Sequence, residues 1–198
     1  YAHLDAVLDA ARARHLRVIF VLANRWHDYG GFPEYLRWCD PEATFEASGN
    51  LPMAMLGRFY GSNAARSLYR AHVERVVSRV HARTSVPYRD DETIFAWELA
   101  NETLAQSDED QAALVAWTRS EATHVKSLDP NHLVGAGHIG YDTLRERDAW
   151  LEVDALDVVD YADVHLYPLG DRRVTSARTL SAALRDRVEL AHGVLHKP

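Results

Sequence analysis

Two polar side chains stand together at the end of an apolar run in the middle of the chain. Residues 94–99 read as a buried strand, and Asn101 and Glu102 follow it. Barrel enzymes of the α/β class carry their catalytic groups at the carboxyl ends of parallel strands. A carboxylic acid there can protonate the leaving oxygen of a glycosidic bond, and the neighbouring amide can hold a sugar hydroxyl. The structural alternative is a glutamate that stabilises the start of a following helix, and the spacing alone does not choose between them.

Hydrolysis of a glycoside needs a second carboxylate, and Glu98 is the nearest one on the same strand. Four residues of extended chain separate it from Glu102, about 13 Å at about 3.3 Å per residue. The two carboxylates lie about 5–5.5 Å apart in retaining glycosidases and about 6.5–9.5 Å apart in inverting ones. Glu98 is therefore too distant, and we expect it to be a charge inside the fold, paired with an arginine or a histidine.

Further candidate substrate contacts lie near the ends of two other apolar runs. His165 and Tyr167 are two residues apart on a predicted strand and therefore face the same way, where the Tyr167 hydroxyl can meet a developing charge. Trp26 and Tyr29 lie in a loop after a strand, and aromatic faces stack well on the apolar faces of sugars. Ordinary packing is the alternative explanation for both pairs.

The elements that must position these groups alternate along the chain. Periodic apolar residues predict helices at 3–15, 62–83, 108–128, 143–153 and 175–195, and apolar runs predict strands at 18–23, 94–99, 133–137 and 161–166. Ser62 is placed to cap the second helix, and residues 24–61 form a long connection of the kind that is usually functional. This α/β order without hairpin signals indicates a parallel sheet with helical crossovers.

The composition limits the class of protein and its partners. The 198 residues are 47% hydrophobic and 26% charged, which is typical of one globular domain. The net charge is −7 and no basic stripe is present, so we expect no nucleic acid partner. No apolar run approaches the roughly 20 residues that span a bilayer, so we expect no membrane partner. The 11 histidines form no recognisable ligand motif, and we assign neither a metal nor a cofactor.

One motif supports a competing hypothesis. Gly135, Gly137 and Gly140 form a G-x-G-x-x-G pattern after a predicted strand, with Asp157 about 20 residues further on, as in a dinucleotide-binding loop. However, the following segment is charged where a crossover helix should pack small residues on the sheet, and Asp157 precedes its strand instead of ending it. A nicotinamide-dependent dehydrogenase is therefore the weaker hypothesis.

The stretch Trp97-Glu98-Leu99-Ala100-Asn101-Glu102, with residues 88–96 before it, resembles the acid strand of glycoside hydrolase family 5. Within that family it is most similar to the endo-β-1,4-mannanases. Residues 24–31 resemble the loop after the third barrel strand, residues 127–133 the approach to the fifth, and residues 165–168 the end of the sixth. The resemblance covers most of residues 4–168.

This resemblance implies a (β/α)8 TIM barrel and a retaining mechanism on β-1,4-mannan or glucomannan, with no cofactor. Glu102 would be the general acid/base, and Asn101 would hold the adjacent sugar hydroxyl. His165 and Tyr167 would line the cleft, with the Tyr167 hydroxyl on the nucleophile. The family's proline after the catalytic glutamate is replaced by Thr103, which would loosen the loop. A glutamate that the family carries near residues 137–140 is also absent.

Residues 1–198 are expected to form a single incomplete catalytic barrel domain, approximately strands 3 to 6 with their helices. The nucleophilic glutamate is expected outside this chain, and the natural N-terminus before Tyr1. A wedge of four strands leaves apolar edges unpaired, so we predict that the isolated chain is at best marginally folded and inactive. By resemblance, the whole protein is expected to be extracellular and monomeric. A non-catalytic carbohydrate-binding barrel is a further alternative.

Overall fold

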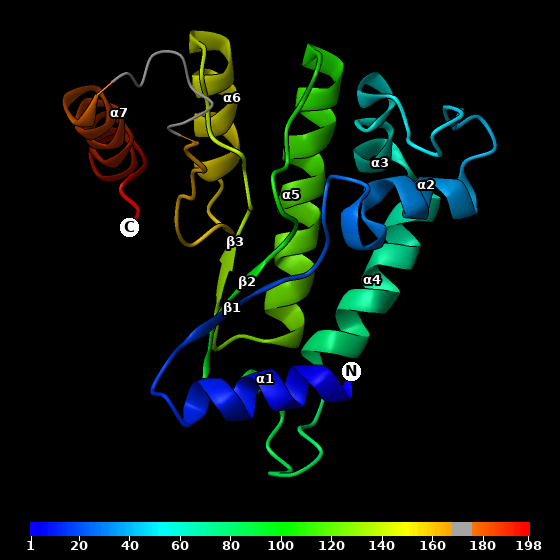
Figure 1. The fold of residues 1–198 in the computed structure, drawn as a ribbon, viewed down its shortest axis with the longest axis vertical. Helices are drawn as coiled ribbons and strands as arrows, with labels where there is room; N and C mark the ends of the chain where they lie inside the picture. The colour runs from blue at the N-terminus through cyan, green and yellow to red at the C-terminus, as the bar shows by residue number, and fades with distance from the viewer. Residues whose placement is uncertain (168–175) are drawn as a thin grey trace.

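The computed structural model describes residues 1–167 and 176–198, in which helices alternate with strands (Figure 1). The longer helices are α1 (Ala2–Arg12), α2 (Phe32–Cys39), α4 (Asn63–Val77), α5 (Asp108–Leu128), α6 (Leu144–Asp154) and α7 (Ala177–Leu190). Shorter helical segments are η1 (Asp28–Gly30), η2 (Met53–Met55), α3 (Arg58–Gly61), η3 (Tyr88–Asp90) and η4 (Ala191–Leu195). The strands are β1 (Val18–Val21), β2 (Ile94–Glu98) and β3 (Leu133–Gly135).

The three strands form one parallel sheet in the order β1-β2-β3, as the alternating pattern predicts. Val21 pairs with Glu98 across β1 and β2, and Glu98 pairs with Gly135 across β2 and β3. The carboxyl ends of all three strands therefore lie at one edge of the sheet, and the residues that follow them meet there.

The predicted strand at 161–166 is wrong, because this segment runs beside β3 without strand pairing. The backbone amides of Gly137 and His138 donate to the carboxylate of Asp163 at 2.8 and 3.0 Å, so they do not donate to a neighbouring strand. Single backbone bonds join the segment to the chain beyond β3, such as the one from His165 N–H to the Ile139 carbonyl at 3.1 Å. The side chain of Asp163 thus takes the place of backbone hydrogen bonds that a fourth strand, predicted from the apolar pattern, would form with this part of the chain.

Helices α4 and α5 run alongside the sheet (Figure 1), and a cluster of buried aromatic rings joins α2, α3 and α5. The predicted cap of α4 is confirmed, since Ser62 accepts from the Ala65 amide at 3.2 Å. Phe32 from α2 stacks on Phe59 from α3 with ring centres 3.7 Å apart, and Phe59 meets Trp117 of α5 at 5.8 Å. Both α2 and α3 lie within residues 24–61, which the sequence analysis treated as connection only.

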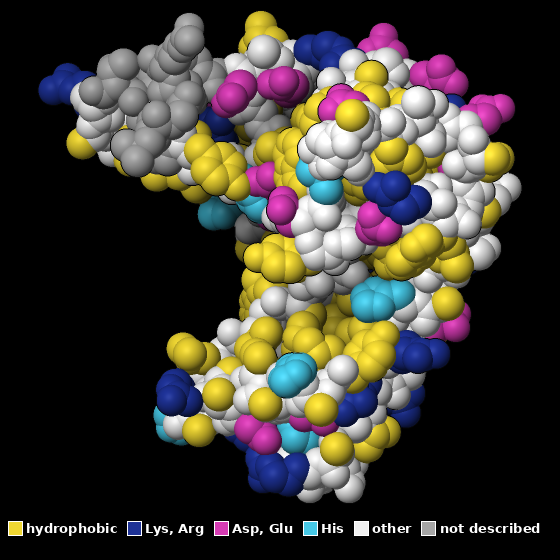
Figure 2. Space-filling model, turned by 45° about the vertical axis from the view of Figure 1, so that its right-hand side comes forward, with side chains coloured by type: hydrophobic (Ala, Val, Ile, Leu, Met, Phe, Trp, Pro, Cys, Tyr) yellow, Lys and Arg dark blue, Asp and Glu magenta, His cyan; other side chains and the backbone are white. Residues whose placement is uncertain are grey.

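Strand β1 is an edge of the sheet and presents apolar side chains to solvent. Ile19 and Val21 of β1 are 44% and 48% exposed, and Phe95 of the neighbouring strand β2 is 48% exposed. Figure 2 shows a deep hollow on one side of the molecule, with hydrophobic side chains over much of its wall. Such an edge and face are what further strands would cover in a closed barrel. Within the described ranges, no helix combines the length and apolar character needed to cross a bilayer.

Candidate active site

Glu102 lies at the carboxyl edge of the sheet, where the pairing of β2 continues beyond the strand itself. Single parallel bridges join Asn24 to Asn101 and Thr103 to His138, on the two sides of Glu102. Glu102 has a backbone φ of 58°, in the left-handed region that non-glycine residues rarely adopt. Its side chain is 9% exposed. The carboxylate is therefore held in a defined place between the ends of the neighbouring chain segments.

Three side chains from two distant segments converge on this carboxylate. The indole Nε1 of Trp26 donates to Oε2 of Glu102 at 2.5 Å. His165 Nδ1 lies 2.7 Å from Oε1, and the Tyr167 hydroxyl donates to the same oxygen. Because an ionised carboxylate only accepts hydrogen bonds, we assign the proton of the His165 ring to Nδ1. The structure thus brings together four of the six residues that the sequence analysis singled out, and three of them act on the fourth.

The donors decide the charge of Glu102. Burial alone would raise its pKa, but the hydrogen bonds from Tyr167, His165 and Trp26 outweigh burial and lower the pKa below the usual value for glutamate. In the described arrangement Glu102 is therefore an ionised group, which is the form of a general base. The resemblance implies that the Tyr167 hydroxyl meets the nucleophile; here it meets Glu102 instead.

Asn101 and Tyr29 lie outside this group of contacts. The Asn101 side-chain amide donates to the Asn24 side-chain oxygen at 3.0 Å, and the two residues are paired through their backbones. Tyr29 has a fully exposed side chain and a φ of 58° at the turn before α2. The sequence placed Tyr29 with Trp26, but the structure points only Trp26 at the carboxylate. Pro168 of the His165–Pro168 motif lies outside the described residues.

Thr103, which stands where the family has proline, is held by two backbone hydrogen bonds, so the looser loop expected from the sequence is not observed. The Thr103 amide donates to the Gly137 carbonyl at 2.9 Å, and the Thr103 carbonyl accepts from the Ile139 amide at 3.2 Å. Proline has no N–H and could not form the first of these bonds. The residue after Glu102 is therefore tied to the chain beyond β3.

The glycine pattern after β3 serves close packing. A Cβ at Gly137, whose φ is +73°, would lie 1.9 Å from the Ala100 carbonyl oxygen. The amides of Gly137 and His138, which a dinucleotide phosphate would need, are already bonded to Asp163. Helix α6 begins only at Leu144, several residues after the last glycine. The dinucleotide hypothesis is therefore not favoured. Within the part of the chain that the structure describes, no three His, Cys, Asp or Glu side chains are grouped as metal ligands.

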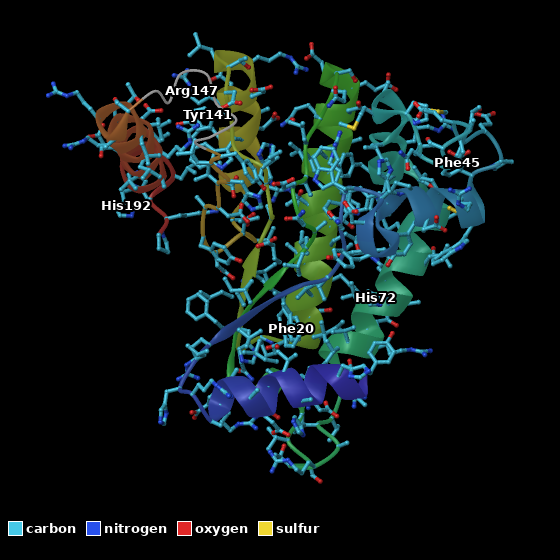
Figure 3. The ribbon with its side chains drawn as sticks, in the orientation of Figure 1. Phe20, Phe45, His72, Tyr141, Arg147 and His192 are labelled. Carbon is cyan, nitrogen blue, oxygen red and sulfur yellow. The ribbon has the colours of Figure 1, made fainter. Side chains whose placement is uncertain are left out.

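A cavity of about 320 Å³ opens beside the two residues that contact Glu102 from the 161–167 segment. Its wall includes His165, Tyr167, Leu104, Ile139 and Tyr141. Figure 3 shows Tyr141 between α6 and α7, where its hydroxyl donates to Asp186 of α7 at 2.7 Å. The cavity therefore offers an aromatic wall and polar groups next to the carboxylate.

Sequence reasoning did not single out Arg25, which directly precedes the candidate residue Trp26. Arg25 is fully buried, and the centre of its guanidinium lies 4.9 Å from the centre of the Trp26 ring. An arginine directly after an apolar strand reads as a solvent-exposed loop residue, so the sequence carries no signal that this one is enclosed.

Comparison with known proteins agrees with this geometry. A family model described as GH family 5 beta-mannosidase-like matches residues 1–175. A rice protein, mannan endo-1,4-beta-mannosidase 7 of Oryza sativa subsp. japonica, is 33% identical over 186 residues, which cover 83% of this chain and 45% of the rice protein. Mannan endo-1,4-beta-mannosidase 7 of Arabidopsis thaliana is 32% identical over 211 residues, with 98% of this chain and 47% of the relative covered.

Solved structures give the same result. The endo-beta-1,4-mannanase from Thermotoga petrophila superposes on the whole of this chain with a TM-score of 0.83 and 28% identity, and the match covers 44% of that enzyme. The chain thus spans less than half the length of these relatives, and the predicted partial barrel is confirmed. On the strength of the family match, the chain belongs to glycoside hydrolase family 5, in its beta-mannosidase-like group.

Proposed function

We propose that the protein containing this chain is a retaining endo-glycosidase of β-1,4-mannan or glucomannan, with Glu102 as general acid/base. The observation that carries the proposal is a buried carboxylate after a parallel strand with three side-chain donors on it. The names of the relatives, which are mannan endo-1,4-beta-mannosidases, support the substrate class. We further propose that the protein is extracellular and monomeric, and that residues 1–198 form part of one catalytic barrel domain.

The reaction needs Glu102 in two protonation states. In the first step its proton goes to the departing sugar oxygen while a second carboxylate attacks the anomeric carbon and forms a glycosyl ester. In the second step ionised Glu102 takes a proton from water, whose oxygen replaces that carboxylate at the anomeric carbon. We propose that the second carboxylate comes from outside residues 1–198.

The contacts of Glu102 suit the change between these states. A second carboxylate about 5–5.5 Å away would raise the pKa of Glu102 by like-charge repulsion, which favours the protonated acid of the first step. Once that carboxylate is esterified, its charge is gone. The donors Trp26, His165 and Tyr167 then favour ionised Glu102, which is the base of the second step.

The other residues would bind the glycan. We propose that Asn101 holds the sugar hydroxyl next to the reacting bond, and that His165 and Tyr167 form the wall of the cleft at the cavity beside Glu102. The exposed ring of Tyr29 is free to stack on a sugar farther along the chain of the polysaccharide.

The test uses the longest natural chain that contains residues 1–198, assayed on β-1,4-mannan with the anomeric configuration of the product followed by NMR. We expect retention. Glu102→Gln should reduce mannan hydrolysis by roughly 10²–10⁴-fold, the size of general acid–base catalysis. It should reduce the first step far less on a dinitrophenyl glycoside, because that leaving group departs without a proton. Glu92→Gln, at an exposed site before β2, is the matched control.

Two outcomes would contradict the proposal. Inversion at the anomeric carbon would exclude the two-step mechanism. Equal affinity for mannan in the wild-type protein and in Glu102→Gln, with no turnover in either, would favour a non-catalytic carbohydrate-binding barrel.

A further inference from the structure

Arg25 is a buried cation that forms no ion pair with the described residues. Its side chain is fully enclosed, and none of its three guanidinium nitrogens makes a hydrogen bond of good geometry to the described residues. Its backbone is fixed, since its amide donates to the Asn101 carbonyl at 3.1 Å. Buried charges are normally paired, because transferring an ion out of water costs several kcal/mol, and the attraction to an opposite charge offsets this cost. The charge of Arg25 must therefore be stabilised by the polar and charged groups around it.

The groups around Arg25 show where this stabilisation comes from. Burial lowers the pKa of Arg25, while the Tyr60 hydroxyl and the carboxylates of Asp110 and Glu102 favour its charged form. His138 also faces the site. Burial is the main reason that the pKa of His138 falls to about 4, and the charges of His165 and Arg25 add to the fall. His138 is therefore neutral at pH 7 and brings no second positive charge.

The guanidinium lies over the face of the Trp26 indole. The distance of 4.9 Å to the ring centre is within the range of a cation–π interaction. The same indole donates its N–H to Glu102 Oε2 at 2.5 Å. One aromatic ring thus carries a cation over its face and a carboxylate at its edge. A cation over the face draws electron density from the ring and makes the N–H a stronger donor.

We propose that Arg25 is a positioning residue for the acid/base reaction, an inference that rests on the function proposed above. It holds the face of the Trp26 indole so that the indole N–H stays on Glu102, and its positive charge stabilises the carboxylate form. Arg25 itself touches neither the substrate nor the reacting atoms. Glu102 has two other hydrogen-bond partners, His165 and Tyr167. They come from a different segment of the chain and act independently of Arg25.

The test is a titration of Glu102 in the longest natural chain that contains residues 1–198. Carbon-13 NMR of labelled glutamate gives the titration midpoint of Glu102, which is the pH at which half of the carboxyl groups are ionised. The Glu102 signal is assigned by its absence in Glu102→Gln. The nitrogen-15 signal of the Trp26 indole reports the hydrogen bond from the indole to Glu102. Arg25→Met should raise the midpoint by about one pH unit, as expected for the loss of one nearby charge in a partly buried site. The indole signal should lose its dependence on Glu102 ionisation. The alkaline limb of kcat/KM should move to higher pH by the same amount.

Two further variants separate positioning from general destabilisation. Arg25→Lys keeps the positive charge but lacks the planar guanidinium group. We therefore expect the titration midpoint of Glu102 to stay close to the wild-type value and the indole signal to change. Arg79→Met removes an arginine that pairs at 2.5 Å with buried Asp5 of α1. It should lower stability and leave both signals in place.

The proposal is overturned if folded Arg25→Met keeps the wild-type midpoint of Glu102 and the wild-type indole signal. If Arg25→Met does not fold, an unchanged indole signal in Arg25→Lys overturns the positioning role. Absence of mannan hydrolysis in the wild-type protein would refute the proposed function and leave the titration result standing, so the two failures are distinguishable.

Discussion

Glu98 allows a pH dependence of stability to be worked out from the structure. It lies at the end of β2 and is 9% exposed, and His165, a residue of the kind expected as its partner, acts on it through charge without a salt bridge between the described residues. Burial raises the pKa of Glu98 to about 7, and the nearby charge of Asp163 adds to the effect. The folded chain therefore keeps a proton on Glu98 at pH values where the unfolded chain has lost it.

The sign and size of the effect follow from this difference. A carboxyl group whose pKa is raised on folding contributes its full stability below the unfolded value and loses it as the pH rises through the folded value. The change from 4.5 to about 7 corresponds to up to about 3 kcal/mol, at about 1.4 kcal/mol per pH unit. Asp163, whose pKa burial raises to about 6, adds a second loss in an overlapping range.

The perturbation is Glu98→Gln, which stays neutral at every pH. We expect it to match the wild type near pH 4.5 and to be more stable at pH 8 by up to about 3 kcal/mol. The assay is urea unfolding at both pH values at constant ionic strength, with sucrose present to stabilise the folded state. Glu92→Gln, which removes an exposed carboxylate, should keep the wild-type difference between the two pH values. The reasoning is refuted if Glu98→Gln and the wild type differ by the same amount at pH 4.5 and pH 8.

Three further outcomes are expected. Gly137→Ala places a Cβ 1.9 Å from the Ala100 carbonyl oxygen at a φ of +73°, so urea unfolding should show a loss of about 2 kcal/mol or more, and wild-type stability would contradict the close-packing argument. Thr103→Pro removes the amide that donates to the Gly137 carbonyl and should lower the unfolding free energy by about 1 kcal/mol or more, whereas a rise in stability would show that this bond does not tighten the loop. Purified residues 1–198 should show no mannan hydrolysis and a broad thermal transition, because the edge at β1 is unpaired; measurable turnover that Glu102→Gln abolishes would refute this.

The parts of the fold that the sequence predicts well depend on local pattern. The apolar run before Glu102 predicts β2, because a buried parallel strand is apolar on both faces. The turn after α5 predicts where β3 begins, and the alternation of helices and strands predicts that the strands are parallel. The approach of Trp26 to Glu102 is also accessible, since polar residues after adjacent parallel strands meet at one edge, whereas His165 and Tyr167 reach Glu102 from a segment that is not a strand.

The rest depends on contacts that no local pattern records. The segment 161–166 is apolar enough for a strand, but a single side chain, that of Asp163, takes the amides that pairing needs. Helix α2 follows two glycines and starts at Phe32 with Pro33 in its first turn, and these breakers hide its short apolar stripe. The burial of Arg25 depends on the ring of Trp26 and on α3 and α5, elements that are distant from one another in sequence.

The left-handed backbone conformation of Glu102 lowers the stability of the fold at the same residue that carries the proposed acid/base carboxylate. A residue with a Cβ in this conformation costs about 1–2 kcal/mol relative to glycine, which adopts it freely. Glycine here would relieve this strain and would remove the carboxylate that we propose as the proton donor. A Glu102→Gly variant should therefore recover this conformational cost and lose the acceptor of the bonds from Trp26, His165 and Tyr167.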